Sequence, residues 1–124
     1  MGNYGRAAVR AVKLIHDGTC KNPEDAWRKA LNEYTHSESS RNKSCPREAF
    51  LDLCEEGMVM GIPAGDYTSS TKNKAYAINA VGILRESKRE LKQKDLWKRA
   101  APGTDHHNGQ MDVVLSLWEQ GFIR

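Results

Sequence analysis

The sequence has 124 residues, of which 28% are charged, 39% hydrophobic and 7% aromatic. This composition is typical of one globular domain and excludes a disordered tail, and the absence of an apolar run near 20 residues excludes a membrane-spanning helix. Nineteen Lys and Arg residues against 16 Asp and Glu residues leave a net charge of +3, a mild excess that permits an anionic partner without requiring one.

Two helices are predicted at the start of the chain. Apolar residues at helical spacing predict the first over residues 4–17, and Gly18 ends it because glycine adopts the left-handed conformation at little cost. The second begins at Asn22, which can cap the first turn, and Pro23, whose missing N–H costs nothing there. Its apolar stripe consists of Trp27, Ala30, Leu31 and Tyr34.

A polar stretch over residues 35–44 separates the second helix from a third. The third helix is predicted to begin near Pro46 and to end at Gly57. The apolar residues 58–63 that follow are too few for a helix, so we expect an extended tail, either a small strand or a plug against the core.

The helical pattern restarts after a connector rich in Gly, Ser and Thr. It predicts three more helices, whose apolar stripes are Ala77, Ala80, Val81 and Leu84; Leu96, Trp97 and Ala100; and Met111, Val114, Leu115 and Trp118. Phe122 and Ile123 form a second apolar tail.

The two halves resemble copies of one unit. The matching segments are residues 8–15 with 77–84 at a shift of 69, residues 27–30 with 97–100 at a shift of 70, and residues 51–59 with 115–123 at a shift of 64. One deletion of six residues in the polar loop accounts for the last change of shift. Order, residue types and a single gap together indicate an internal duplication.

These observations predict an all-α fold of six helices in a single domain, because a unit of about 55 residues buries too little apolar area to be stable alone. We expect two three-helix units around a pseudo-twofold, with at most a vestigial β pairing between the tails. The expected division is repeat 1 over about 4–62, a connector over 63–73 and repeat 2 over about 74–124. The predicted common core contains Trp27, Phe50, Leu53, Trp97, Leu115 and Trp118.

Two longer motifs carry a resemblance to a known family. Residues 45–63 read C-P-x-x-A-F-L-x-L-C-E-E-G-x-V-x-G-I-P, and residues 110–121 read Q-M-D-V-V-L-x-L-W-x-x-G. The chain resembles, over nearly its whole length, a small bacterial family of domains of unknown function. This resemblance implies a small cytoplasmic protein of a bacterium or mobile element, and it supplies no catalytic residue.

The cysteines favour a reducing compartment. Cys20, Cys45 and Cys54 are odd in number and contain no C-x-x-C pair, so neither a disulfide framework nor a zinc site is expected. The N-terminus has no apolar segment of the secretory kind. We therefore expect a cytoplasmic protein without metal or cofactor.

Enzymatic chemistry would depend on scattered groups, because the sequence lacks the common phosphate-loop, dinucleotide and zinc-protease motifs. The loops before the third and sixth helices carry the most suggestive ones, since histidine transfers protons near neutral pH and a cysteine at a helix start favours its thiolate. This alternative site for a small ligand or a reaction contains His36, Cys45, His106, His107 and Gln110. The simpler interpretation is two solvated loops.

The basic residues gather in two stretches, residues 41–48 and 85–99, with two lysines at the connector. The candidate anion-binding residues are Arg41, Lys43, Arg47, Lys72, Lys74, Lys88, Arg89, Lys92, Lys98 and Arg99. A continuous helix would align Lys88, Lys92 and Arg99, whereas a loop near residues 89–93 would separate them.

The leading hypothesis is a non-enzymatic binding or regulatory module that engages an anionic partner through a basic face. The partner is expected to be nucleic acid or an acidic protein surface, and the sequence does not determine an oligomeric state. A loop of about ten residues between the second and third helices is too long for a tight helix-turn-helix. A merely solvated basic surface is the competing interpretation.

Overall fold

The computed structural model describes the backbone of residues 1–68, 72–103 and 109–124, and their side chains apart from residues 72–74. The predicted all-α fold is confirmed. The helices are α1 (Asn3–His16), α2 (Pro23–Tyr34), α3 (Glu38–Arg41), α4 (Ser44–Glu55), α5 (Lys72–Glu86), α6 (Gln93–Ala100) and α7 (Gln110–Glu119). Within the described ranges, no helix has the length and apolarity needed to cross a membrane.

Six of these helices correspond to the six predicted ones, and their ends follow the local signals. The Asn22 side chain accepts a 2.9 Å hydrogen bond from the backbone N–H of Asp25, so α2 begins at Pro23 as predicted. The one-turn helix α3 lies in the stretch predicted to be an irregular polar loop. It forms because the Ser37 hydroxyl accepts a hydrogen bond from the Ser40 N–H, as a helix cap does.

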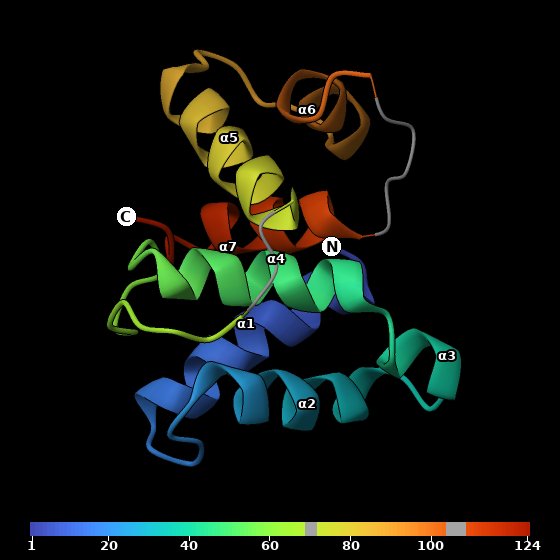
Figure 1. Ribbon diagram of the computed structural model, residues 1–124, viewed down its shortest axis with the longest axis vertical. Coiled ribbons are helices and arrows are strands. Elements are labelled where there is room, and N and C mark those ends of the chain that lie inside the picture. The colour runs from blue at the N-terminus through green and yellow to red at the C-terminus, as the bar shows by residue number, and fades with distance from the viewer. Residues whose placement is uncertain (69–71, 104–108) are drawn as a thin grey trace.

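The helices are arranged in three tiers (Figure 1). The pair α1 and α2 lies on one side, the pair α5 and α6 on the other, and α4 and α7 lie between them. In this arrangement α7 packs on α1, whereas α4 packs on α5. The third helix of each predicted unit therefore packs on the first helix of the other unit.

The core agrees with the prediction except at one residue. Trp27, Phe50, Leu53, Trp97 and Leu115 are buried among the apolar side chains of all three tiers, as expected.

Trp118 was expected in the same core and is only half-buried. It lies near the end of α7, where it borders a surface cavity of about 600 Å³ together with Leu84 of α5 and the loop over residues 87–91. Part of its side chain is therefore exposed to solvent.

The two apolar tails pair as predicted, through one antiparallel bridge between Val59 and Ile123. The Met60 N–H donates to the Phe122 carbonyl at 2.8 Å, and the Arg124 N–H donates to the Met58 carbonyl at 2.9 Å. These two hydrogen bonds exchange when every residue is replaced by its counterpart 64 positions away. This relation is consistent with the predicted pseudo-twofold, and both the pseudo-twofold and the internal duplication stay predictions.

Candidate functional site

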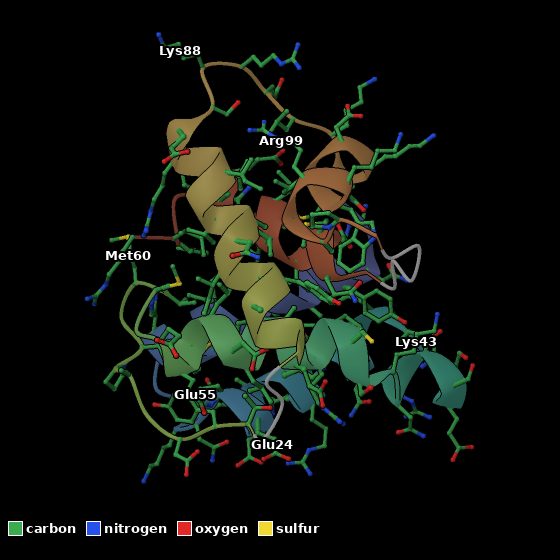
Figure 2. All side chains as sticks on the ribbon, turned by 45° about the horizontal axis from the view of Figure 1, so that its top comes forward. Glu24, Lys43, Glu55, Met60, Lys88 and Arg99 are labelled. Carbon is green, nitrogen blue, oxygen red and sulfur yellow. The ribbon has the colours of Figure 1, made fainter. Side chains whose placement is uncertain are left out.

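The predicted anion-binding residues do not form one surface in the described part of the chain. Lys43 lies near the start of α4, whereas Lys88 and Arg99 lie at the opposite end of the molecule (Figure 2). Helix α5 ends at Glu86 and α6 begins at Gln93, so Lys88 and Lys92 lie in a loop and are not aligned with Arg99 on one helix. Lys72 and Lys74 are at the start of α5, and their side chains lie outside the description.

The two ends differ in the surface beside their basic residues. Lys88 and Arg89 border the cavity that Trp118 lines, whose other walls include the apolar residues Leu84, Leu91 and Leu115. Lys98 and Arg99 are exposed on α6. At the other end of the molecule, by contrast, Arg41 and Arg47 line a groove with mostly polar walls.

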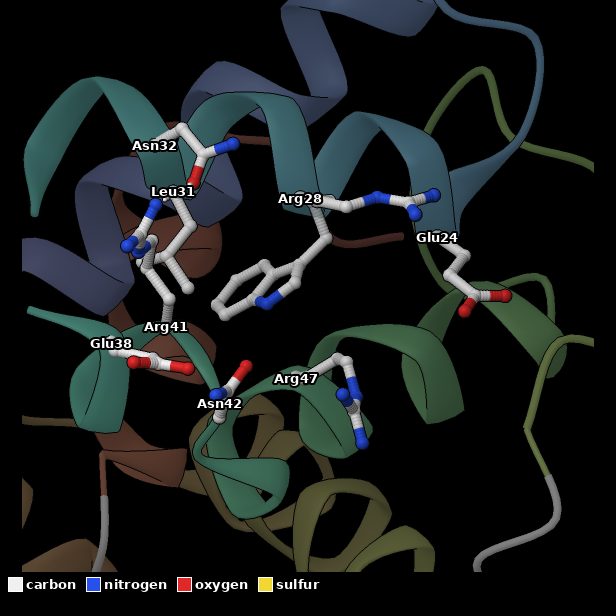
Figure 3. Close-up of a pocket in the computed structure, with 9 residues that line it drawn as sticks. Glu24, Arg28, Leu31, Asn32, Glu38, Arg41, Asn42 and Arg47 are labelled. Atoms are coloured by element: carbon white, nitrogen blue, oxygen red, sulfur yellow. Dashed lines mark hydrogen bonds between the residues drawn. The ribbon is translucent and has the colours of Figure 1, made fainter. Parts of the chain in front are cut away.

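This groove, which we call the arginine groove, lies between α2, α3 and the start of α4 (Figure 3). Its volume is about 390 Å³. It is lined by Glu24, Trp27, Arg28, Leu31, Asn32, Glu38, Arg41, Asn42 and Arg47.

The helical repeat explains the wall that α2 contributes. Glu24, Arg28 and Asn32 follow each other at intervals of four residues, which places them along one edge of the helix. Trp27 and Leu31 repeat at the same interval on the neighbouring, buried edge. The wall thus has a polar rim above an apolar base.

The opposite wall depends on the unexpected helix α3. Its Ser37 cap turns the chain after α2, and Arg41 at its end reaches back, with Nη1 3.5 Å from the Asn32 Oδ1. Arg47 follows from the first turns of α4 and lies across the groove from Arg28 (Figure 3).

The charges in the groove are unevenly satisfied. The Arg28 guanidinium forms an ion pair with Asp25, one turn earlier on α2. For Arg41 and Arg47, the described residues provide no carboxylate within ion-pair distance. Two guanidinium groups therefore face a common groove, and no carboxylate among the described residues forms an ion pair with either of them.

Trp27 forms part of the base of the groove and is only 1% exposed. Its ring stacks on Phe50, with centroids 5.5 Å apart and planes inclined by 26°. Its Nε1 is buried and has no hydrogen-bond partner among the described residues. Because an unpaired buried N–H typically costs about 1–3 kcal/mol, the groove holds a donor that a bound acceptor could satisfy.

The alternative site is only partly assembled in the described residues. A cavity of about 350 Å³ brings Thr35 and Ser40 of the first loop close to Gly109 of the second, with Tyr4 between them. The Tyr4 hydroxyl donates a 3.2 Å hydrogen bond to the Ser40 carbonyl.

The residues predicted for that alternative site do not gather around the cavity. His36 is exposed and is not among the lining residues, Cys45 is half-buried at the start of α4, and Gln110 is buried. His106 and His107 lie outside the described residues. Among the residues that are described, no group of three His, Cys, Asp or Glu side chains could hold a metal ion.

Of the residues that line the groove, the sequence pattern indicated Arg41 and Arg47 alone as binding residues. Arg28 and Asn32 could also have been found from the sequence. They lie four residues apart on the predicted second helix and directly follow Trp27 and Leu31 of its apolar stripe. Glu38 and Asn42 could not be assigned, since only the turn through α3 brings them to α2.

The chain belongs to DUF6979, a family of unknown function whose sequence model matches residues 1–124. The expected membership in an uncharacterised family that covers the whole chain is thereby confirmed, while the bacterial origin stays a prediction. Neither the curated proteins nor the solved structures contain a match to the chain.

Proposed function

We propose that this protein is a non-enzymatic binding module that engages an anionic partner, nucleic acid or an acidic protein surface, through the arginine groove. The observation that carries the proposal is the pair Arg41 and Arg47, which line one groove without a carboxylate partner in the described chain. Guanidinium groups bind phosphate and carboxylate through paired hydrogen bonds, which makes them suited to such a role.

The geometry also supports a passive binding role over catalysis. Trp27 and Leu31 close the base of the groove, and its charged groups lie on the rim, where a partner's surface can meet them. A regulator or inhibitor of another protein would fit this arrangement, because such a module needs a preformed polar surface and no reactive centre.

The proposal can be tested by fluorescence anisotropy at two salt concentrations. The labelled probes are 12-nucleotide DNA and RNA, 12-residue polyglutamate, and a peptide with one Asp between neutral and basic residues. The double variant Arg41→Gln/Arg47→Gln should bind the cognate anion at least ten-fold more weakly. With a nucleic acid the log–log salt slope should also flatten by roughly 1.4–1.8, for two lost phosphate contacts.

Lys88→Gln/Arg89→Gln is the matched control, since it removes the same charge at the other end of the molecule. It should leave binding within about two-fold of the unmodified protein. The proposal fails if no probe binds at low salt, or if the loss follows Lys88 and Arg89 instead of the groove.

A small ligand in the cavity between the two loops is the second candidate, favoured by the contact of Tyr4 with Ser40. Tyr4→Phe removes that hydrogen bond and should then alter ligand binding while leaving the arginine groove unaffected.

A further inference from the structure

Carboxylates bound the arginine groove at its ends. Glu24 lies at one end, and Glu38 lies beside Arg41 at the other (Figure 3). Both belong to the lining, and neither forms an ion pair with Arg41 or Arg47. The positive section is therefore short, and it suits one anionic group whose neighbours are neutral or basic.

A nucleic acid fits this pattern poorly. Duplex DNA presents one negative charge per about 1.7 Å of its axis, so phosphates next to the bound one would meet Glu24 or Glu38. Lys88 and Arg99 lie too far away to compensate, because they are at the opposite end of the molecule.

Single-stranded nucleic acid would need an exposed aromatic ring on which bases stack. Trp27 is the aromatic residue of the groove lining, and it is 1% exposed and already stacked on Phe50. The groove thus offers no free aromatic face in the part of the chain that is described.

The remaining groups match a peptide. Asn32 and Asn42 each offer both an amide donor and a carbonyl acceptor, as a peptide backbone does, whereas a phosphodiester linkage offers acceptors alone. Glu24 and Glu38 can accept from a backbone N–H or from a lysine of such a peptide.

Resting on the proposed function, we infer that the partner is a protein, and that the groove holds one Asp or Glu side chain of an extended segment flanked by neutral or basic residues. The carboxylate lies between Arg41 and Arg47, and the flanking residues meet Glu24 and Glu38. Specificity then comes from the isolated acidic residue, because a run of acidic residues is repelled at both ends.

Titrations followed by ¹H–¹⁵N correlation spectra of the whole protein test this inference, since such spectra detect millimolar affinities and report whether each variant is folded. The probes are the blocked peptide Gly-Lys-Gly-Asp-Gly-Lys-Gly, the same peptide with Asn for Asp, blocked hepta-aspartate, and (dT)12. The Asp peptide should bind at least ten-fold tighter than the Asn peptide and hepta-aspartate. It should shift the indole N–H signal of Trp27.

Charge variants sharpen the test. The variant Glu24→Gln/Glu38→Gln should reverse the preference between the two peptides. Compared with the unmodified protein, it should bind hepta-aspartate at least five-fold more tightly and the lysine-flanked Asp peptide more weakly. The variant Arg41→Gln/Arg47→Gln should abolish binding of hepta-aspartate and of the Asp peptide. The control variant Lys88→Gln/Arg89→Gln should leave the affinity for each peptide unchanged.

The outcomes separate the two proposals. If (dT)12 or hepta-aspartate binds tighter than the Asp peptide and depends on Arg41 and Arg47, the inference is overturned while the anion-binding function stands. If no probe binds the unmodified protein, both are overturned.

Discussion

The carboxylate of Asp112, in the first turn of α7, accepts a 2.7 Å hydrogen bond from the backbone N–H of Gly5, in the first turn of α1. It also accepts from the Gly2 N–H at 2.9 Å. One buried side chain thus replaces the cap that α1 lacks, because Gly2 precedes the helix without a side chain to do so. The contact fixes the last helix of the chain to the start of the first.

Asp112→Asn tests this cap. An amide retains the shape but removes the charge, and its NH₂ group faces the N–H of either Gly2 or Gly5, where a donor meets a donor. We expect the free energy of unfolding to fall by about 1–3 kcal/mol, measured by urea denaturation. Asp66→Asn is the control, since Asp66 is exposed in a loop, and it should change stability by less than about 0.5 kcal/mol. Equal effects at both positions would contradict the capping role.

The same contact depends on the missing side chain of Gly5. A Cβ at this position would stand 2.9 Å from the Asp112 carbonyl oxygen and would clash with the Ser116 Oγ. Gly5→Ala should therefore push α1 from α7 and lower the free energy of unfolding by about 1–3 kcal/mol.

Gly82 supplies the opposite case for comparison. It is exposed within α5, and a Cβ there would meet nothing within 4 Å. Gly82→Ala should raise the free energy of unfolding by about 0.5–1 kcal/mol, because alanine loses less backbone entropy in a helix. The substitutions Gly5→Ala and Gly82→Ala should thus shift the midpoint of thermal unfolding in opposite directions. A stabilising effect of Gly5→Ala would disprove the close packing of α1 on α7.

Trp97 and Trp118 compare a buried and a half-buried tryptophan. Trp97 is 5% exposed and packs edge-on against Tyr76, with ring centroids 5.2 Å apart. Trp97→Ala should lower the free energy of unfolding by about 3–5 kcal/mol, from the lost burial and the cavity left behind. Trp118→Ala should cost clearly less, because part of that side chain is already exposed to solvent. A loss below about 1 kcal/mol for Trp97→Ala would make this residue a surface contact.

Much of the fold was predictable because its signals are local. The Asn22–Pro23 start of α2 and the glycine after α4 depend on a few neighbouring residues, and both are confirmed. The comparison of the two halves predicted at most a vestigial pairing of the apolar tails, and the structure has one bridge, between Val59 and Ile123. By contrast, the exposure of Trp118 depends on where α5 ends relative to α7, which no short stretch of sequence encodes.

In the arginine groove, too, some features follow from local sequence and others only from tertiary contacts. Arg41 and Arg47 were identifiable as basic residues, but their meeting with Arg28 depends on the path of the chain from Thr35 to Lys43. That path is set by the Ser37 cap and by the contact of Tyr4 with Ser40, which lies 36 residues away in sequence. Composition alone could therefore suggest an anionic partner without locating the groove that we propose as its binding surface.

Cys54 gives a pH dependence whose sign can be worked out. Its thiol is fully buried, and burial raises its pKa well above the ordinary value of 9.0 because the thiolate would lose its hydration. In the unfolded chain the thiol ionises at its ordinary pKa, whereas in the folded protein it stays protonated. Above the ordinary pKa, the folded state therefore holds one proton more than the unfolded chain. The stability that the neutral thiol provides is fully present below the ordinary pKa of the unfolded chain, and it is lost as the pH rises from there toward the raised pKa of the folded protein. Each further pH unit should cost about 1.4 kcal/mol.

Urea denaturation between pH 8 and 10.5 checks this expectation, with Cys54→Ala as the comparison that removes the titrating group. The unmodified protein should lose stability more steeply with rising pH than the variant does, and the difference should grow above pH 9.

Cys45 is half-buried and should react with a thiol reagent in the native protein, whereas Cys54 should react only after unfolding. Parallel pH profiles, or rapid native labelling of Cys54, would show that this thiol is open to water.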